Sequence, residues 1–198
     1  MIRLVVGLGN PGKEYERTRH NAGFWLVERF ASANGIVLRK DNKFQALVGR
    51  HEPSGAWLLM PQSFMNASGR AVQMLAGFFK IKQGGGIAGH NGLKDISQRL
   101  ATHDYWRLRL GVGKPPAGME GADYVLQRPP AEERAAIDAA IESALGVLPQ
   151  CLSGDIQSAM QKLHTDDKKQ EDKKPEPKKE PEKESGLKSS LKALFGRK

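Results

Sequence analysis

The sequence predicts an α/β fold, in which a single domain has a twisted mixed β-sheet flanked by helices. Over residues 1–165, apolar runs typical of strands alternate with segments that have helical periodicity. The chain has 198 residues, a length that suits one domain with an appendage. The composition changes after residue 165, where a stretch without large apolar residues begins. We therefore expect one domain over residues 1–165 and a charged tail over residues 166–198.

The first half of the domain is predicted to contain a strand, a helix and a hairpin. Residues 2–8 are rich in Leu and Val and lead into a turn that contains Gly, Asn and Pro, which is typical of the end of a strand. Helical periodicity predicts a helix over residues 22–33. Residues 44–50 and 56–60 lie on either side of a Glu-Pro-Ser-Gly turn, and they predict the two strands of a hairpin.

The second half of the domain is predicted to be mainly helical. Apolar residues at helical spacing predict helices over residues 66–80 and 93–100. A strand is expected at residues 106–112, with its arginines alternating outward. Helices over residues 131–148 and 155–163 complete the domain.

The tail is predicted to be disordered over most of its length. Residues 166–184 contain three prolines and no large apolar residue, so they bury too little surface to offset the entropy of ordering. Residues 186–198 form one apolar stripe among basic residues if they are helical. An isolated helix this short is marginal in water, so we favour a solvated tail over a helix that folds on RNA, a membrane surface or a partner.

Charge and cysteine content narrow the classes of function. The formal net charge is +9, and residues 1–165 alone hold 20 basic and 14 acidic residues. A basic domain favours a polyanionic partner such as nucleic acid, although a lysine-rich solvated surface explains the charge equally well. The single Cys151 excludes a disulfide framework and fits a reducing, cytoplasmic setting. No uninterrupted apolar run approaches the ~20 residues that cross a bilayer, so no membrane span is expected.

A glycine pattern after the first strand resembles a nucleotide site but does not predict one. Residues 7–12 match G-x-G-x-x-G, the pattern of dinucleotide-binding folds. Those folds need a helix to begin inside the motif, so that its N-terminus meets the pyrophosphate. Here Pro11 and a polar stretch delay the helix to about residue 22, and Glu28 lies within that helix. We therefore expect no nucleotide cofactor.

Polar residues at strand-to-helix turns form the candidate site. Asn10 follows the first strand, His20 precedes the first helix, Asn66 begins the next helix and Asn91 follows a glycine run. Open α/β sheets bind ligands at the carboxyl ends of their strands, so these residues could converge on one crevice. A histidine with an ordinary pKa of about 6.5 is suited to general-base chemistry. The structural alternatives are a surface histidine, an N-cap asparagine and a flexible glycine loop.

Four stretches of the chain closely resemble the bacterial-type peptidyl-tRNA hydrolase family. They are VGLGNPGKEYERTRHNAGF, PQSFMNASG, GGGIAGHNGLKDI and WRLRLGVGKP, and they occur in the order found in the family. The resemblance spans nearly all of residues 1–165. It implies a cytoplasmic, monomeric enzyme that hydrolyses the ester joining a peptide or an N-blocked amino acid to tRNA. It also implies that the enzyme uses no metal or organic cofactor.

The resemblance implies roles for individual residues. His20 matches the general base for the attacking water, and Asn10 matches a residue that contacts the peptide. Four further residues match positions that line the site and touch the tRNA end or the peptide: Tyr15, Phe64, Asn66 and Asn91. Lys82 and Arg109 match a basic pair that holds the tRNA 5′ phosphate. Cationic side chains suit that task because they position phosphates without reading sequence.

The chain departs from the family pattern at one place. After residue 81 the family continues through a buried strand, which ends in a segment whose aspartate orients the catalytic histidine. Here Ile81 runs directly into Lys82 and a glycine run, so we expect a sheet that lacks one strand and that aspartate. The alternatives are an impaired enzyme and a non-catalytic tRNA-binding or RNA-binding protein. Three carboxylates are candidates to replace the aspartate, and no spacing favours any of them: Glu14, Glu16 and Asp95.

Overall fold

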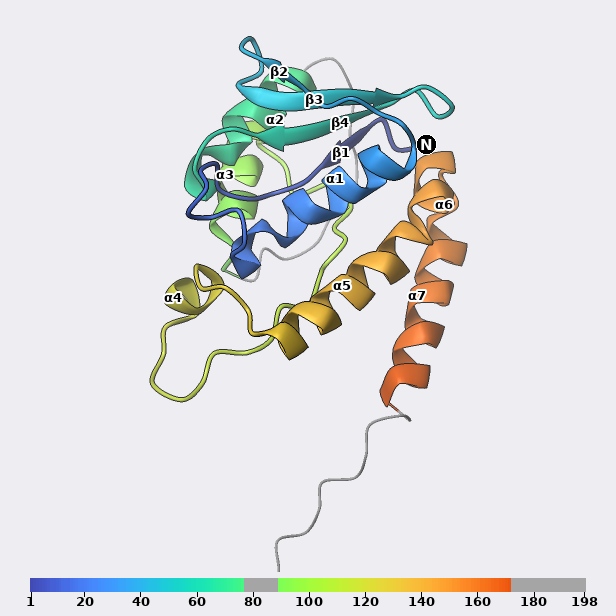
Figure 1. Cartoon of the computed structure of the whole chain (residues 1–198). Helices are drawn as coiled ribbons and strands as arrows, with labels where there is room; N and C mark the ends of the chain where they lie inside the picture. The colour runs from blue at the N-terminus through green and yellow to red at the C-terminus, as the bar shows by residue number, and fades with distance from the viewer. Residues whose placement is uncertain (77–88, 172–198) are drawn as a thin grey trace, which may run out of the picture.

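The computed structural model describes residues 1–76 and 89–171. Its strands are β1 Leu4–Val6, β2 Arg39–Asp41, β3 Ala46–His51 and β4 Ala56–Pro61. Its α-helices are α1 Ala22–Ala33, α2 Ser68–Ala76, α3 Asn91–Leu100, α4 Gly121–Val125, α5 Ala131–Leu145, α6 Leu148–Ser153 and α7 Ile156–Glu171. Two 3-10 helices, η1 Arg19–Asn21 and η2 Met65–Ala67, precede α1 and α2 (Figure 1).

The sheet is mixed, as the sequence predicts. Its strand order is β1-β4-β3-β2, with β1 parallel to β4 and the other two pairs antiparallel. The central strand β4 is almost entirely buried. The edge strand β2 consists of the charged residues Arg39, Lys40 and Asp41. Charged side chains on an edge strand discourage pairing with other chains.

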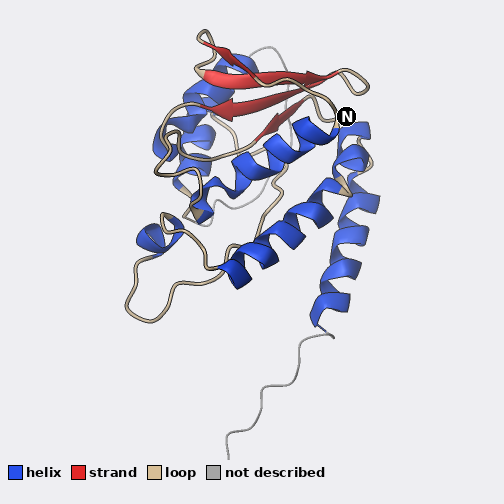
Figure 2. Ribbon diagram, in the orientation of Figure 1, coloured by secondary structure: helices blue, strands red, loops and turns tan. Residues whose placement is uncertain are grey.

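Helices cover both faces of this sheet (Figure 2). Leu58 and Met60 of β4 pack with α1 and α6, whereas Leu59 between them packs with α2 on the opposite face. This alternation is the two-residue period of a strand with both faces buried. A third apolar cluster joins Trp25 and Leu26 of α1 to α5. Helix α1 therefore lies between the sheet and α5.

The end of β1 and the start of α1 approach each other so closely that the helix needs a glycine there. A Cβ atom added to Gly23 would lie 2.6 Å from both the backbone nitrogen and the backbone oxygen of Leu8. Backbone atoms cannot turn aside as the end of a flexible side chain does. The close approach fixes where α1 begins relative to the carboxyl end of β1.

We expect Gly23→Ala to destabilise the fold. Overpacking costs about 1–3 kcal/mol and this clash is with backbone, so it outweighs the gain of up to about 1 kcal/mol in helix propensity. The free energy of unfolding in urea measures the change. Gly111→Ala is the matched control, because a Cβ at Gly111 meets no atom within 4 Å. Equal stability of the two variants would contradict the close approach.

Most of the predicted elements are confirmed. The helix over 22–33 and the hairpin are present, and α3 begins two residues before its predicted start. Strand β1 is shorter than predicted, and α2 is described as far as Ala76. The helix predicted over 131–148 is confirmed as α5, but it ends three residues early at Leu145, and a separate helix α6 begins at Leu148. Gly146 is the C-cap of α5, and Pro149 in the first turn of α6 has no N–H to extend the hydrogen bonds of α5.

The strand predicted over residues 106–112 is wrong. The segment has no ladder hydrogen bonds, and β1 pairs with β4 alone among the described residues. An extended segment becomes a strand only when a neighbouring strand lies beside it. Leu110 and Val112 still pack against the third apolar cluster. The expected outward arginines are only half correct, since Arg109 is exposed whereas Arg107 is half-buried.

Helix α7 runs to Glu171, into the segment for which composition predicts a disordered linker. Lys, Gln and Glu are good helix formers, and extending an existing helix avoids the cost of nucleation. The rest of the predicted linker and the amphipathic segment at 186–198 lie outside the described residues. The domain boundary at residue 165 stays a prediction.

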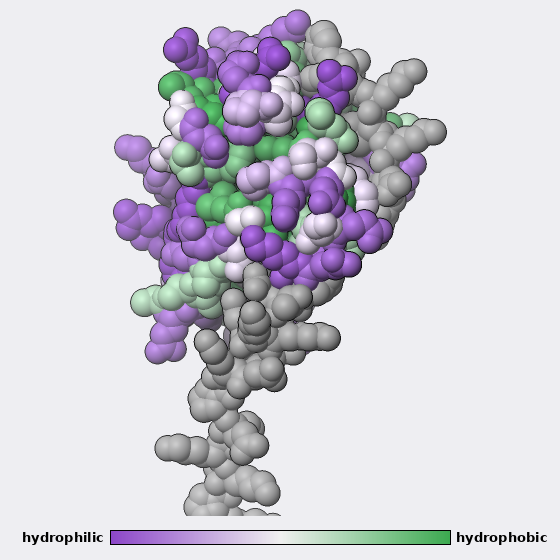
Figure 3. Space-filling model, turned by 90° about the vertical axis from the view of Figure 1, so that its right-hand side faces the viewer, coloured by the Kyte–Doolittle hydropathy of each residue, from purple (hydrophilic) through white to green (hydrophobic). Residues whose placement is uncertain are grey.

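One stretch, Ala131–Ser153, is long and apolar enough to cross a membrane by length and composition alone. Counting uninterrupted apolar runs misses it because charged residues interrupt it. Its Ile137, Ile141 and Ala144 pack in the third apolar cluster against α1, as expected for a core helix. Single apolar side chains also reach the surface, among them Val37 and Met160. On the face in Figure 3, patches of hydrophobic residues lie among hydrophilic ones.

Candidate active site

Asn10 is held at the carboxyl end of β1 by three hydrogen bonds. Its N–H donates to Oδ1 of Asn21 at 2.8 Å, and its carbonyl accepts from Nδ2 of Asn21 at 2.9 Å. Its own Oδ1 accepts from the N–H of Met65 at 2.7 Å. Because Met65 occupies Oδ1, the amide group of Asn10 has one orientation. Its Nδ2 is the group that is left to donate to a ligand.

Asn21 is a site residue that sequence reasoning missed. It is buried at 3% exposure, and both of its bonds go to the backbone of Asn10, eleven residues earlier. The feature of the sequence that could have pointed to Asn21 is its position directly after His20. The pairing ties the turn after β1 to η1, which carries His20.

We expect Asn21→Ala to lower both stability and activity. The change leaves a buried N–H and a buried carbonyl of Asn10 without partners, and each unsatisfied group costs about 1–3 kcal/mol. Denaturant unfolding and steady-state turnover measure the two effects. The exposed Asn42→Ala is the matched control, since Asn42 lies in a surface turn. Unchanged stability of Asn21→Ala would show that the paired bonds contribute nothing.

His20 faces a second histidine that the sequence reasoning did not single out. The ring centroids of His20 and His90 lie 5.4 Å apart, with 41° between the ring planes. Burial and, to a smaller extent, the charge of His90 lower the pKa of His20 to about 4. His20 is therefore neutral at physiological pH and able to accept a proton. No hydrogen bond from any residue in 1–76 or 89–163 reaches its ring.

His90 is positioned by the start of α3. Its Nδ1 accepts from the N–H of Leu93 at 3.3 Å, so His90 is the N-cap of that helix. In the neutral ring the proton is then on Nε2. A Cβ atom at Gly92 would lie 2.7 Å from Sδ of Met65 and 3.1 Å from Cε1 of His90. Glycine at position 92 thus allows α3, η2 and the His90 ring to meet.

The residues expected to bind substrate lie on the same elements. Tyr15 and Phe64 contact each other edge to face at 6.1 Å, and the side chain of Phe64 is 57% exposed. Asn66 is exposed within η2, and Asn91 is exposed at the first residue of α3. Neither asparagine is an N-cap, because Phe64 and His90 hold those positions. Both amides are therefore available to a ligand.

The two predicted phosphate ligands are not brought together in what the structure describes. Arg109 is exposed in the irregular segment after α3. Lys82 lies outside the described residues. The basic pair stays a prediction.

None of the three carboxylates considered as replacements for the missing aspartate is hydrogen-bonded to His20. Asp95 is hydrogen-bonded to α2, where its Oδ2 accepts from the N–H of Gly69 at 2.7 Å. It also pairs with Arg99 at 3.0 Å. Glu14 and Glu16 are exposed in the loop before η1. The orienting role is thus not filled by any of these three.

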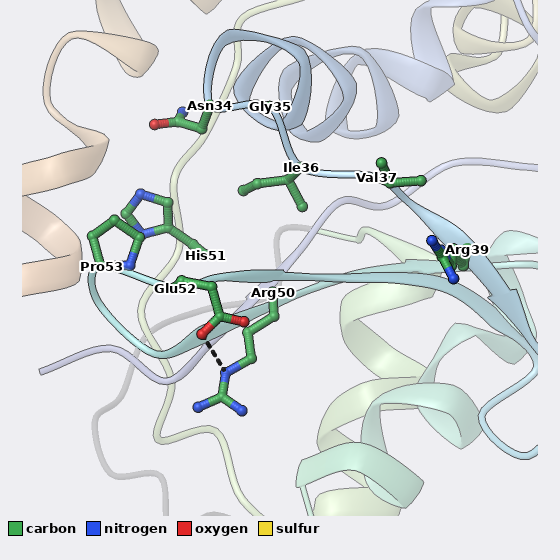
Figure 4. Close-up of a pocket in the computed structure, with 9 residues that line it drawn as sticks. All are labelled: Asn34, Gly35, Ile36, Val37, Arg39, Arg50, His51, Glu52 and Pro53. Atoms are coloured by element: carbon green, nitrogen blue, oxygen red, sulfur yellow. Dashed lines mark ion pairs between the residues drawn. The ribbon is translucent and has the colours of Figure 1, made fainter.

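Two further observations concern metal binding and a second pocket. Among residues 1–76 and 89–163, no group of three or more His, Cys, Asp or Glu side chains is placed to hold a metal ion. A surface pocket lies between the C-terminal end of α1 and the β3–β4 hairpin, where Arg50 pairs with Glu52 at 3.7 Å (Figure 4). Its lining contains none of the predicted site residues.

The fold and the site together define the class of protein. A neutral histidine and several amide groups lie at the turns after β1 and β4 of a mixed sheet. This combination fits an α/β enzyme of the hydrolytic class, because a neutral histidine is able to accept a proton from water.

Comparison with known proteins identifies the family. The sequence model of the peptidyl-tRNA hydrolase family matches residues 4–83 and 73–173. A peptidyl-tRNA hydrolase of Thiobacillus denitrificans is 48% identical over 184 residues, covering 82% of this chain and 90% of that protein. One of Cupriavidus metallidurans is 47% identical over 196 residues, covering 83% and 99%. The crystal structure of the Acinetobacter baumannii peptidyl-tRNA hydrolase superposes with a TM-score of 0.76 at 37% identity, covering 82% of this chain and 94% of that one. The chain belongs to the peptidyl-tRNA hydrolase family.

The matches also bear on the missing strand. The family model matches in two pieces, which overlap over residues 73–83 of this chain. The alignment with the Cupriavidus protein extends over 196 residues although it covers 83% of a 198-residue chain, so that relative has residues without a counterpart here. Both observations agree with the internal deletion after Ile81.

Proposed function

We propose that this protein hydrolyses the ester bond between tRNA and a peptide or an N-blocked amino acid, which returns the tRNA to translation. The observation that carries the proposal is the neutral His20, whose neighbour Asn21 is hydrogen-bonded to Asn10, within one stretch that matches a family motif. Relatives that share 46–48% of their residues over more than four fifths of the chain bear the name of that activity. Such substrates arise during translation, so the proposed location is the cytoplasm, and the family resemblance supports a monomer.

The reaction follows from the groups at the site. His20 accepts a proton from water while the water oxygen attacks the ester carbonyl carbon. The tetrahedral intermediate then breaks the bond between that carbon and the ribose oxygen. The protonated His20 returns its proton to the ribose oxygen, which regenerates the neutral base. Nδ2 of Asn10 donates to a carbonyl of the peptide and holds the ester near the base.

The remaining residues are proposed to bind the tRNA end and the peptide. Tyr15 and Phe64 supply aromatic rings on which the unpaired bases of the tRNA end are able to stack. The amides of Asn66 and Asn91 supply donors and acceptors. Arg109 and Lys82 are proposed to contact the 5′ phosphate.

A second candidate function is tRNA binding without hydrolysis. The observation that favours it is the His20 ring, to which no carboxylate of residues 1–76 or 89–163 is hydrogen-bonded. In a serine-protease triad, loss of the orienting carboxylate lowers kcat by about 10⁴-fold. A comparable loss here would suppress hydrolysis and leave tRNA binding intact.

Release of N-acetyl-amino acid from purified N-acetyl-aminoacyl-tRNA by the full chain tests the proposal. We expect turnover from protein whose cooperative unfolding and circular dichroism show that it is folded. A folded chain that binds the tRNA without releasing the amino acid would establish the second function instead.

A further inference from the structure

One buried guanidinium fastens the segment around α4 to the loop that carries His20. Arg19, the residue before His20, is 4% exposed. Its Nε and Nη2 donate to Oε2 of Glu133 in α5 at 3.0 and 2.6 Å. Its Nη1 donates to the carbonyls of Tyr124 and Gln127 at 3.2 and 3.1 Å. The four bonds join η1 to α5 and to the C-terminal end of α4.

Four other contacts complete this network. The backbone N–H of Arg19 donates to the carbonyl of Gln127 at 3.2 Å. The guanidinium carbon lies 4.0 Å from the ring centroid of Tyr124, within the range of a cation–π interaction. The hydroxyl of Tyr124 lies 3.0 Å from Oε2 of Glu133 and 3.3 Å from the carbonyl of Val112. The hydrogen bonds from Arg19 lower the pKa of Glu133, which keeps its carboxylate charged.

Apolar burial alone does not hold the α4 segment in place. Of residues 113–130, Tyr124 is the one buried residue, and α4 itself spans five residues. Exposed segments with few buried apolar contacts open at low free-energy cost unless polar contacts hold them. The network around Arg19 supplies those contacts, and α4 lies next to η1 (Figure 1).

We propose that Arg19 is a positioning residue, which fixes the α4 segment as a wall beside His20 and holds η1 in the orientation that the base requires. This inference rests on the proposed function. Lysine is a poor replacement because it carries one compact ammonium group, whereas the planar fork of arginine reaches the carboxylate and both carbonyls together. The role thus depends on the shape of the guanidinium group as well as on its charge.

Arg19→Lys tests the proposal, and Arg29→Lys is its matched control. Arg29 also joins α1 to α5, where it pairs with Asp138 and Glu142, but it has no contact with α4. We expect Arg19→Lys to lower kcat by roughly 10- to 100-fold, the effect of a misplaced catalytic group. Hydrogen exchange of residues 113–130 should accelerate, and the NMR resonances of the His20 ring should shift. Arg29→Lys should leave kcat, exchange and the His20 resonances unchanged.

The readouts separate failure of this inference from failure of the proposed function. Faster exchange without a change in the His20 resonances or in kcat would overturn it, because Arg19 would then be merely structural. Equal effects in Arg29→Lys would overturn it as well. If the parent chain shows no turnover, exchange and the His20 resonances still decide the role of Arg19. If Arg19→Lys folds poorly, Glu133→Gln is the substitute test. Glutamine keeps the shape of the side chain but weakens the hydrogen bonds from Arg19, so we expect a smaller fall in kcat and a smaller rise in hydrogen exchange.

Discussion

Replacing His20 with alanine is expected to lower kcat by roughly 10²–10⁴-fold, the contribution of a general base. His20 is half-buried and lies outside the three apolar clusters, so its removal costs little packing. The free energy of unfolding should therefore stay close to that of the parent chain. Single-turnover hydrolysis of N-acetyl-aminoacyl-tRNA measures the chemical step without interference from product release.

The exposed His103 provides the matched control. His103→Ala should retain full activity, because His103 lies in the turn after α3. If both variants hydrolysed the substrate at the parental rate, His20 would not be the base. Binding of tRNA should persist in His20→Ala, since the base contributes to the chemical step and not to the charge of the domain.

The acid limit of the reaction is expected at an unusually low pH. A general base must be neutral, and His20 has its pKa lowered to about 4, first by burial and then by His90. An ordinary histidine loses its neutral form below about pH 6.5. Here kcat/KM should stay level down to about pH 5 and fall about tenfold per pH unit below about pH 4. An acid limb centred near the ordinary histidine pKa would contradict this environment.

Folding must be followed at the same pH values, because the lowered pKa also affects stability. The unfolded chain takes up a proton on His20 at higher pH than the folded chain does, so stability falls as the pH drops from about 6.5 toward about 4. His90→Asn tests the smaller cause of the shift. Asparagine keeps the N-cap of α3 but removes the charge of His90. The acid limb should move to higher pH and remain below that of an ordinary histidine, since burial persists.

The sequence predicted those helices and strands that are determined by the residues of a single short segment. The helix α1 and the β3–β4 hairpin follow from apolar periodicity and turn residues over short stretches. The segment at residues 106–112 has an equally good local pattern but lacks a partner strand, and a strand depends on what lies beside it. Helix α7 differs from its local pattern in the opposite direction. Its composition beyond residue 165 predicts disorder, but the preceding helical turns extend the helix into that segment.

The candidate site shows the same division. His20, Asn10, Asn66 and Asn91 lie at turns that the strand and helix pattern marks. His90 becomes visible only when α3 packs against η2 and brings its ring to His20. Arg19 depends on Glu133, which lies more than a hundred residues later in the chain. Contacts across that separation leave no periodic signal in a single sequence.

The position of α1 between the sheet and α5 restricts how this sequence can drift over evolution. Its buried residues serve two cores at once, so a change of volume on either side must be matched by changes in two other elements. Exposed positions within it are confined to Glu28, Ser32 and Ala33. Neutral substitutions should therefore accumulate at those three positions and in the outer loops, while the rest of α1 changes slowly. Because η1 leads directly into α1, the segment that carries His20 is attached to a helix whose packing resists change.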